Sequence, residues 1–181
     1  MTKQVAFLRA INVGGHTVKM DALRGLFEAL GLAGVETFIA SGNVLFDPAA
    51  GDARALEKKI EAHLQQALGY QVATFIRSTD ELVEALRYPA FPAADVEAEG
   101  HGLYIGFLAE SPAEETVQKL LACTTAVDAF HVHGREVYWL CRTRFSESLF
   151  GGQRMEKTLG AQATFRNVTT LQKIVAKYTY G

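Results

Sequence analysis

Three polar segments of the chain carry residue types that could bind an anion. The first runs from Arg9 to His16 and includes Asn12, Gly14 and Gly15. Paired glycines let backbone N–H groups approach an anion, and a following helix would direct its positive end toward it. The segment matches neither the GxGxxG fingerprint nor the phosphate-binding P-loop. A turn that needs glycine only for its backbone conformation is therefore the alternative.

The second segment is Ser41-Gly42-Asn43, which separates two runs rich in β-forming residues. Glycine and asparagine tolerate positive φ, so a hairpin turn is the simplest interpretation. In a ferredoxin-like sheet this turn would lead into a strand antiparallel to the first strand. We therefore expect the turn and the first loop to lie at the same edge of the sheet and to share a site.

The third segment is Arg166-Asn167-Val168-Thr169-Thr170, at the expected start of the last helix. Arg166, Asn167 and Thr170 are suitable anion ligands at a helix N-terminus. The alternative is an ordinary helix start in which Asn167 or Thr169 is the capping residue. The anion hypothesis requires this segment to converge in space with the first two.

Metal and catalytic chemistry have less support. His131 and His133 alternate along an expected strand and so share a face. A zinc ion needs three or four ligands and no further ligand is evident, so we predict neither a metal nor a cofactor. An enzyme hypothesis uses His16 as acid or base, with Arg9 or Arg166 stabilising negative charge on a phosphorylated substrate. No Ser-His-Asp arrangement or nucleophile elbow is recognisable.

The composition is that of an ordinary globular protein, with 49% hydrophobic and 21% charged residues among 181. A net charge of −2 disfavours duplex DNA as a partner. Cys123 and Cys141 form no CxxC pair or zinc spacing, which predicts free thiols. The N-terminus has no signal-peptide pattern and no run approaches the ~20 apolar residues of a membrane span, so we expect a cytoplasmic protein. The oligomeric state stays open.

The elements that must position these segments follow the same order twice. Apolar spacing predicts β-α-β-β-α-β in the first half, over residues 4–10, 20–30, 35–40, 44–46, 52–69 and 71–76. The order returns over residues 103–108, 111–121, 126–132, 136–141, 146–159 and 161–165. Ser111 and Ser78 each begin a capping pattern, and further helices are expected over 78–86 and 168–178. The prediction is an α+β fold, an α/β sandwich of two ferredoxin-like units at 1–77 and 103–181, joined by a helix and loop at 78–102.

The motifs LRAINVGG, TFIASGNVLF and TFRNVTTLQK resemble the DUF1697 family, a bacterial family of unknown function. The third motif differs from the family pattern T-x-R-N-W-x-T at Phe165 and Val168, and Leu149 follows Ser148 where relatives often have a Ser-Lys pair. The resemblance implies the domain unit and no activity. Carried over to this chain, the motif positions that are candidates for ligand binding are Arg9, Asn12, Gly14, Gly15, Ser41, Gly42, Asn43, Arg166, Asn167 and Thr170.

Three functional hypotheses follow. The first is a module that binds a small anionic ligand, a nucleotide or phosphorylated metabolite, at the converging loops. The second is an enzyme that acts on a phosphorylated substrate with the same cluster. The third is a protein or RNA interaction module, in which Arg9, Arg77, Arg142 and Arg144 would line a basic groove.

Overall fold

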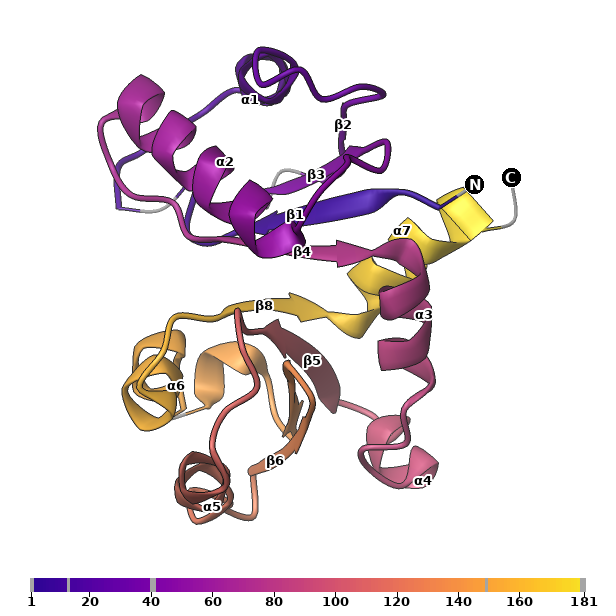
Figure 1. The fold of residues 1–181 in the computed structure, drawn as a ribbon. Coiled ribbons are helices and arrows are strands. Elements are labelled where there is room, and N and C mark those ends of the chain that lie inside the picture. The colour runs from indigo at the N-terminus through magenta and orange to yellow at the C-terminus, as the bar shows by residue number, and fades with distance from the viewer. Residues whose placement is uncertain (1, 13, 40–41, 149, 180–181) are drawn as a thin grey trace. The chain divides into compact units, whose positions relative to one another are not determined.

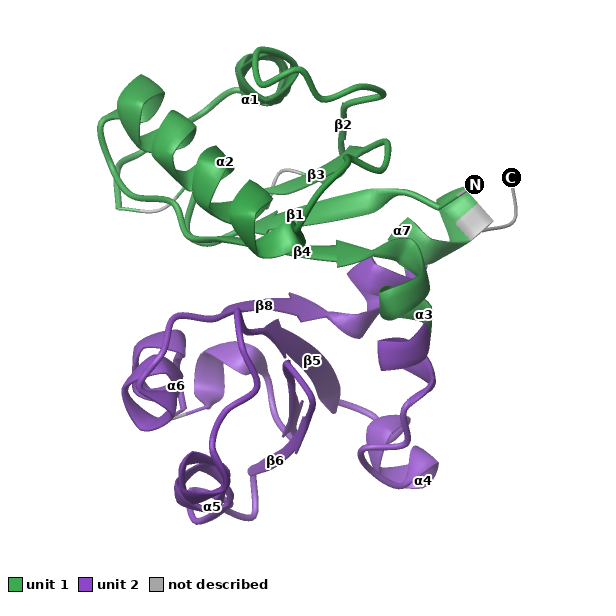
Figure 2. Cartoon of the chain, viewed as in Figure 1, with its two compact units in different colours: residues 1–83, 173–181 green, residues 84–172 purple. Residues whose placement is uncertain are grey.

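A computed structural model describes residues 2–12, 14–39, 42–148 and 150–179 (Figure 1). Its contacts divide the chain into two compact units, residues 1–83 with 173–181 and residues 84–172 (Figure 2). The division predicted from the sequence, at 1–77, 78–102 and 103–181, stays a prediction, because contact density does not test which segments fold independently. Within the described ranges, no helix is both long enough and apolar enough to cross a lipid bilayer.

The first unit contains a four-stranded antiparallel sheet in the order β2-β3-β1-β4. Its elements are β1 (Gln4–Leu8), α1 (Met20–Glu28), β2 (Glu36–Thr37), β3 (Asn43–Phe46), α2 (Ala53–Leu68) and β4 (Thr74–Ser78). In Figure 1, α1 and α2 cover one face of the sheet. The core between helices and sheet includes Leu23, Phe27, Ile60, Leu64, Ala6, Val44 and Ile76. This order and pairing are those of a ferredoxin-like unit.

The second unit repeats the topology with the strand order β6-β7-β5-β8, again antiparallel. Its elements are β5 (Gly102–Phe107), α5 (Glu114–Leu121), β6 (Asp128–His133), β7 (Glu136–Cys141), the 3-10 turn η1 (Phe145–Glu147), α6 (Gly152–Leu159) and β8 (Thr164–Asn167). Its core is more aromatic, with Phe130, Trp139 and Phe150 packed against Leu120 and Met155. The predicted α+β fold class is confirmed.

Two predicted helix starts in the second unit are wrong. Helix α5 begins at Glu114 with Ala113 as its N-cap, and no side chain caps it, so Ser111 does not have the predicted role. The expected helix over 146–159 begins only at Gly152. Glycine costs about 1 kcal/mol relative to alanine inside a helix, so Gly151-Gly152 disfavours an earlier start.

Three further helices lie outside the two repeats. Helices α3 (Thr79–Arg87) and α4 (Ala93–Val96) follow the last strand of the first sheet, and α7 (Val168–Thr179) follows the last strand of the second. The capping box at the start of α3 is confirmed, because the Ser78 N–H donates to Glu81 Oε2 at 2.7 Å and the Glu81 N–H to Ser78 Oγ at 3.1 Å. Asn167 caps α7, since its Oδ1 accepts the Thr169 N–H at 2.8 Å. In the first unit, Lys177 and Tyr178 near the end of α7 donate to Glu36 of β2.

Glutamate side chains cover the outer edge of β4. The Thr74 N–H donates to Glu61 at 2.9 Å, the Ile76 N–H to Glu57 at 2.8 Å and the Ser78 N–H to Glu81 at 2.7 Å. Glu57 is only 1% exposed and its second oxygen accepts Arg54 Nη1 at 2.8 Å. An edge strand ordinarily presents such donors to solvent or to another strand. Here they are hydrogen-bonded within the unit.

Candidate functional site

The first predicted loop, in the first unit, is held by its own hydrogen bonds. Asn12 Oδ1 accepts the Val18 N–H at 2.7 Å, and the half-buried Arg9 donates its backbone N–H to Ala73 O at 2.9 Å. Gly14 and Gly15 are exposed, with φ of +68° and +86°, and apart from their chain neighbours no described atom lies within 4 Å of where a Cβ would stand. Their backbone conformation, and not packing, therefore favours glycine.

The second predicted loop touches the first. The Leu8 N–H donates to Gly42 O at 2.8 Å, and a Cβ on Gly42 would lie 2.8 Å from Ile11 Cγ2. The two loops thus meet at one edge of the sheet, as their topology predicts; Ser41 lies outside the described residues. Asn43 is 1% exposed and its Nδ2 donates to Phe38 O at 2.9 Å, so this amide braces the turn.

Two non-glycine residues with positive φ lie in these same loops, Ala10 at 53° and Ile39 at 57°. A positive φ is unfavourable for a β-branched residue such as Ile39, which is also 49% exposed. Beside the first loop, His16 stacks on Tyr70 at 3.8 Å between ring centroids, and Tyr70 OH donates to Ile11 O. Among the described residues, no carboxylate pairs with His16, so the loop offers it no acid–base partner.

The third predicted segment lies in the second unit. Arg166 is 8% exposed, and its Nη1 donates to Thr164 Oγ1 at 2.7 Å and to Phe165 O at 3.0 Å. Burial lowers the pKa of Arg166 to about 10. Asn167 is occupied as the helix cap, and Thr170 is half-buried in the first turn of α7. Convergence of this segment with the loops of the first unit stays a prediction.

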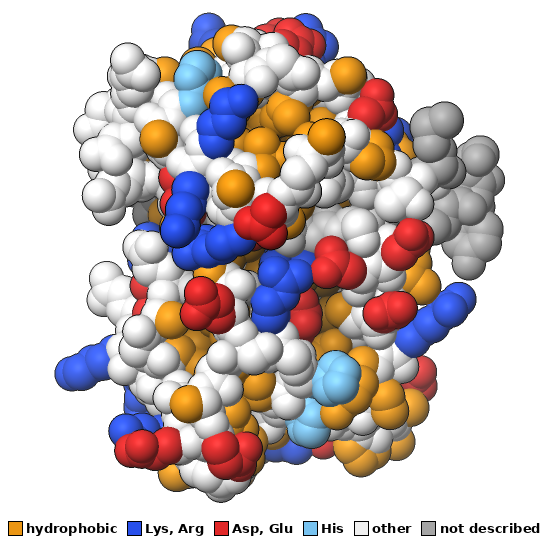
Figure 3. All heavy atoms as spheres, in the orientation of Figure 1, with side chains coloured by type: hydrophobic (Ala, Val, Ile, Leu, Met, Phe, Trp, Pro, Cys, Tyr) orange, Lys and Arg blue, Asp and Glu red, His pale blue; other side chains and the backbone are white. Residues whose placement is uncertain are grey.

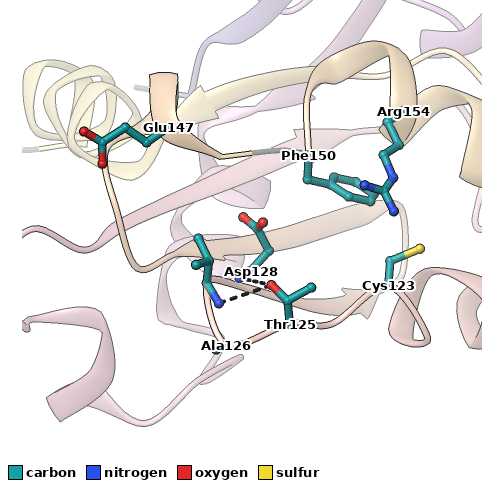
Figure 4. A pocket seen from close by; sticks show the side chains of 8 residues that line it. Cys123, Thr125, Ala126, Asp128, Glu147, Phe150 and Arg154 are labelled. Carbon is teal, nitrogen blue, oxygen red and sulfur yellow. Dashed lines mark hydrogen bonds between the residues drawn. The ribbon is translucent and has the colours of Figure 1, made fainter.

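A pocket of about 340 Å³, which the sequence did not predict, lies wholly within the second unit (Figure 4). It is lined by Cys123, residues 125–128, Glu147, Phe150 and Arg154. These residues come from the turn after α5, the start of β6 and the segment around the start of α6. Ligand pockets typically enclose roughly 300–1,000 Å³, with apolar walls and few polar groups. Cys123 and the Ser148-Leu149 pair, both noted in the sequence, lie at this lining or next to it along the chain, but neither indicated a pocket.

A buried carboxylate forms one side of this pocket. Asp128 is 4% exposed, and its Oδ1 accepts the Trp139 indole N–H at 2.8 Å and the Ser148 hydroxyl at 2.9 Å. Ser148 Oγ accepts the Phe150 N–H in turn, at 3.0 Å. The neutral indole and hydroxyl donors therefore hold the Asp128 carboxylate in place. Burial raises the pKa of the neighbouring Cys141 thiol, and the Asp128 charge adds to this effect.

An arginine forms another side. The Arg154 guanidinium carbon lies 5.0 Å from the centroid of the Phe150 ring, a cation–π contact that Figure 4 shows from the side. No carboxylate pairs with Arg154 in the part of the chain that the structure describes. Glu147 points away from the other labelled side chains in Figure 4 and accepts the Thr143 hydroxyl at 2.6 Å. Thr125 Oγ1 accepts the backbone N–H groups of the turn into β6.

The histidine pair on β6 packs against an aromatic ring. Tyr88 OH is 2.8 Å from His131 Nε2, and the Tyr88 ring stacks on His133 at 3.9 Å. Burial, with a smaller effect of His133, lowers the pKa of His131. Across the described ranges, no three His, Cys, Asp or Glu side chains gather closely enough to hold a metal ion.

Two of the four arginines predicted to line a basic groove for RNA are buried or paired with a carboxylate. Arg77 is 1% exposed, and Arg142 makes a two-pronged contact with Asp95 at 3.1 and 2.7 Å. Hydrogen bonding to Arg142 lowers the pKa of Asp95. On the face drawn in Figure 3, basic and acidic side chains are interspersed. Such a surface differs from the basic stripe typical of nucleic-acid-binding proteins.

Comparison with known proteins adds a family and a fold. Over nearly its whole length the chain is similar to a solved structure, that of the conserved bacterial protein SP0830 from Streptococcus pneumoniae. The two share 23% sequence identity with a TM-score of 0.72, over 96% of this chain and 97% of the other. No curated protein matches the chain. The family model for the protein of unknown function DUF1697 matches residues 1–138, and the chain therefore belongs to the DUF1697 family.

Proposed function

We propose that the protein binds a small anionic molecule in the pocket of the second unit, with Arg154 as the anion's partner. One observation carries the proposal: a guanidinium lines a largely apolar pocket and has no carboxylate partner among the described residues. Charge-assisted hydrogen bonds from arginine to a carboxylate or phosphate are about twice as strong as neutral ones. The planar guanidinium also fits such groups in a two-pronged geometry.

The charges of the pocket favour a ligand with a single negative group. The motifs favoured a nucleotide or phosphorylated metabolite, yet in this pocket a single arginine lies with the buried carboxylate of Asp128. A polyphosphate brings several negative charges, which one arginine cannot balance and which the Asp128 carboxylate would repel. A carboxylate, or at most one phosphate group, fits this balance better. A volume of about 340 Å³ also points to a ligand at the small end of the usual range.

The test is a thermal-shift panel of small carboxylates, sugar phosphates, nucleotides and inorganic anions. A ligand at 100 times its Kd stabilises the folded state by about 2.7 kcal/mol, which raises Tm measurably. We expect Arg154→Gln to weaken binding at least tenfold. Lys157→Gln removes the same charge from the same helix at a position outside the pocket lining and should leave binding unchanged. Equal binding by wild type and Arg154→Gln would overturn the proposed site.

The loop pair of the first unit is a second candidate for the same ligand class. The contact between the two loops and their strained backbone at Ala10 and Ile39 support it, because unfavourable backbone geometry tends to gather at functional sites. Its ligand groups would be Arg9 and the backbone of Gly14 and Gly15. Backbone NMR shifts on ligand addition separate the candidates, since the changes should centre either on residues 9–18 or on residues 123–128 and 147–154.

A further inference from the structure

We infer that the ligand of this pocket is a zwitterion, an α-amino acid with an apolar side chain, whose ammonium group faces Asp128 and whose carboxylate faces Arg154. The inference rests on the proposed function and specifies its ligand. It comes from a second, independent feature, the negative charge on the other side of the pocket.

Asp128 is a buried carboxylate without a cation. Its side-chain hydrogen-bond partners, the Trp139 indole, the Ser148 hydroxyl and the Cys141 thiol, are all neutral donors. No lysine, arginine or histidine pairs with it in the described part of the chain. A buried charge is unfavourable unless it is paired, even when hydrogen bonds satisfy some of its lone pairs. The pocket thus lacks a positive group beside Asp128.

Arg154 lacks a negative group on the same pocket, and the two side chains do not pair with each other. Arg154 is held over the Phe150 ring at 5.0 Å, and Asp128 is anchored by Trp139 and Ser148. Two opposite charges are therefore kept apart on one pocket. A molecule that carries an ammonium and a carboxylate a few bonds apart supplies both missing partners at once.

The rest of the lining indicates the side chain of that amino acid. The pocket has an apolar wall, formed by Ala126, Val127 and Phe150. Such a wall favours burial of an aliphatic or aromatic group. Glu147 is engaged by Thr143 and turns away, so it does not compete for the ammonium group.

The experiment compares L-leucine with two analogues that each lack one charged group, 4-methylpentanoate and 3-methylbutylamine, by titration calorimetry on the full chain. We expect leucine to bind at least tenfold more tightly than either analogue. A parallel series uses phenylalanine, 3-phenylpropanoate and 2-phenylethylamine, so that side-chain size does not decide the result. If neither amino acid binds more tightly than its matching acid, the zwitterion inference is overturned.

Variants assign the effect to the two charges. Asp128→Asn keeps an oxygen for Trp139 and should remove most of the preference for leucine over 4-methylpentanoate. Arg154→Gln should weaken leucine and 4-methylpentanoate alike, with Lys157→Gln as the control. Should Asp128→Asn fail to fold, the analogue series on wild type still decides. Tight binding of the simple acid with no gain from the amine supports the proposed function and overturns only this inference; failure of every acid in the panel overturns both.

Discussion

The two units share one topology and differ in the helix that precedes the last strand. Helix α2 has 16 residues and α6 has 8. In the first unit α2 begins at once after its cap, where Asp52 Oδ2 accepts the Ala55 N–H at 2.9 Å, and it lies along the sheet. In the second unit the chain first forms η1 and an irregular segment, and the pocket opens beside the late start of α6.

The helix before the last strand thus covers the core in the first unit and borders a pocket in the second. The long helix directs Glu57 and Glu61 to the backbone of β4. The short helix instead leaves Arg154 at the wall of a pocket, and the polar contacts move to Asp128 and Ser148. A buried carboxylate thus braces each unit, and the one in the second unit also lines a cavity.

The largest effect is expected from removal of the Glu57 carboxylate, which holds the backbone of β4 in the first unit. Glu57→Ala removes the acceptor of the buried Ile76 N–H and of Arg54, and we expect it to lower the free energy of unfolding by about 3 kcal/mol. Glu57→Gln keeps an oxygen for Ile76 and should lose about 1 kcal/mol. Urea denaturation measures both. A loss below that of the glutamine variant would show that the carboxylate does not brace β4.

The next effect tests the contact between the two loops. Gly42→Ala combines a positive φ with a Cβ placed 2.8 Å from Ile11, and should destabilise by about 2 kcal/mol or more. Gly14→Ala has a similar φ but open space around it, so it should cost about 1 kcal/mol. The difference in urea midpoint between the variants isolates the packing of the loops. Equal losses would contradict that contact.

A smaller, stabilising effect concerns the late start of α6. Gly152 lies in the first turn of α6, and apart from its chain neighbours and the helix backbone no described atom lies within 4 Å of where a Cβ would stand. We expect Gly152→Ala to stabilise the protein by about 0.5–1 kcal/mol, because alanine is the better helix former. Thermal melting measures the gain, with Gly25→Ala in α1 as a matched substitution where space is also open. Destabilisation at Gly152 would mean that its conformation differs from the helical one described.

The smallest effects are pH-dependent and contrast β6 with β2. The pKa of His131 is lowered in the folded state, so its contribution to stability is complete above about pH 6.5 and is lost as pH falls toward the lowered pKa. Hydrogen bonds from Lys177 and Tyr178 lower the pKa of Glu36, whose contribution is lost only below about pH 4.3. Melting temperatures across pH 3–8 should lose the upper step in His131→Gln and the lower step in Glu36→Gln. If the pH profile of Tm in one variant equals that of the wild type, the replaced residue does not contribute to the loss of stability in acid.

Sequence patterns predicted the fold well because strand and helix periodicities recur in each half. They predicted the meeting of the first two loops, since topology alone places both at one sheet edge. They did not reveal that Arg166 is buried, because burial depends on which face of β8 is covered. The sequence did not reveal the pocket because its lining comes from two separate stretches, within residues 123–128 and 147–154, which meet only in the folded second unit.

The bond between Trp139 and Asp128 gives the protein a built-in optical reporter. Trp139 is the single tryptophan in the chain, and its indole N–H donates a hydrogen bond to the carboxylate that lines the pocket. A positive group that arrives beside Asp128 changes the electric field at the indole. Intrinsic fluorescence will therefore register the arrival of such a group in the pocket of unlabelled protein.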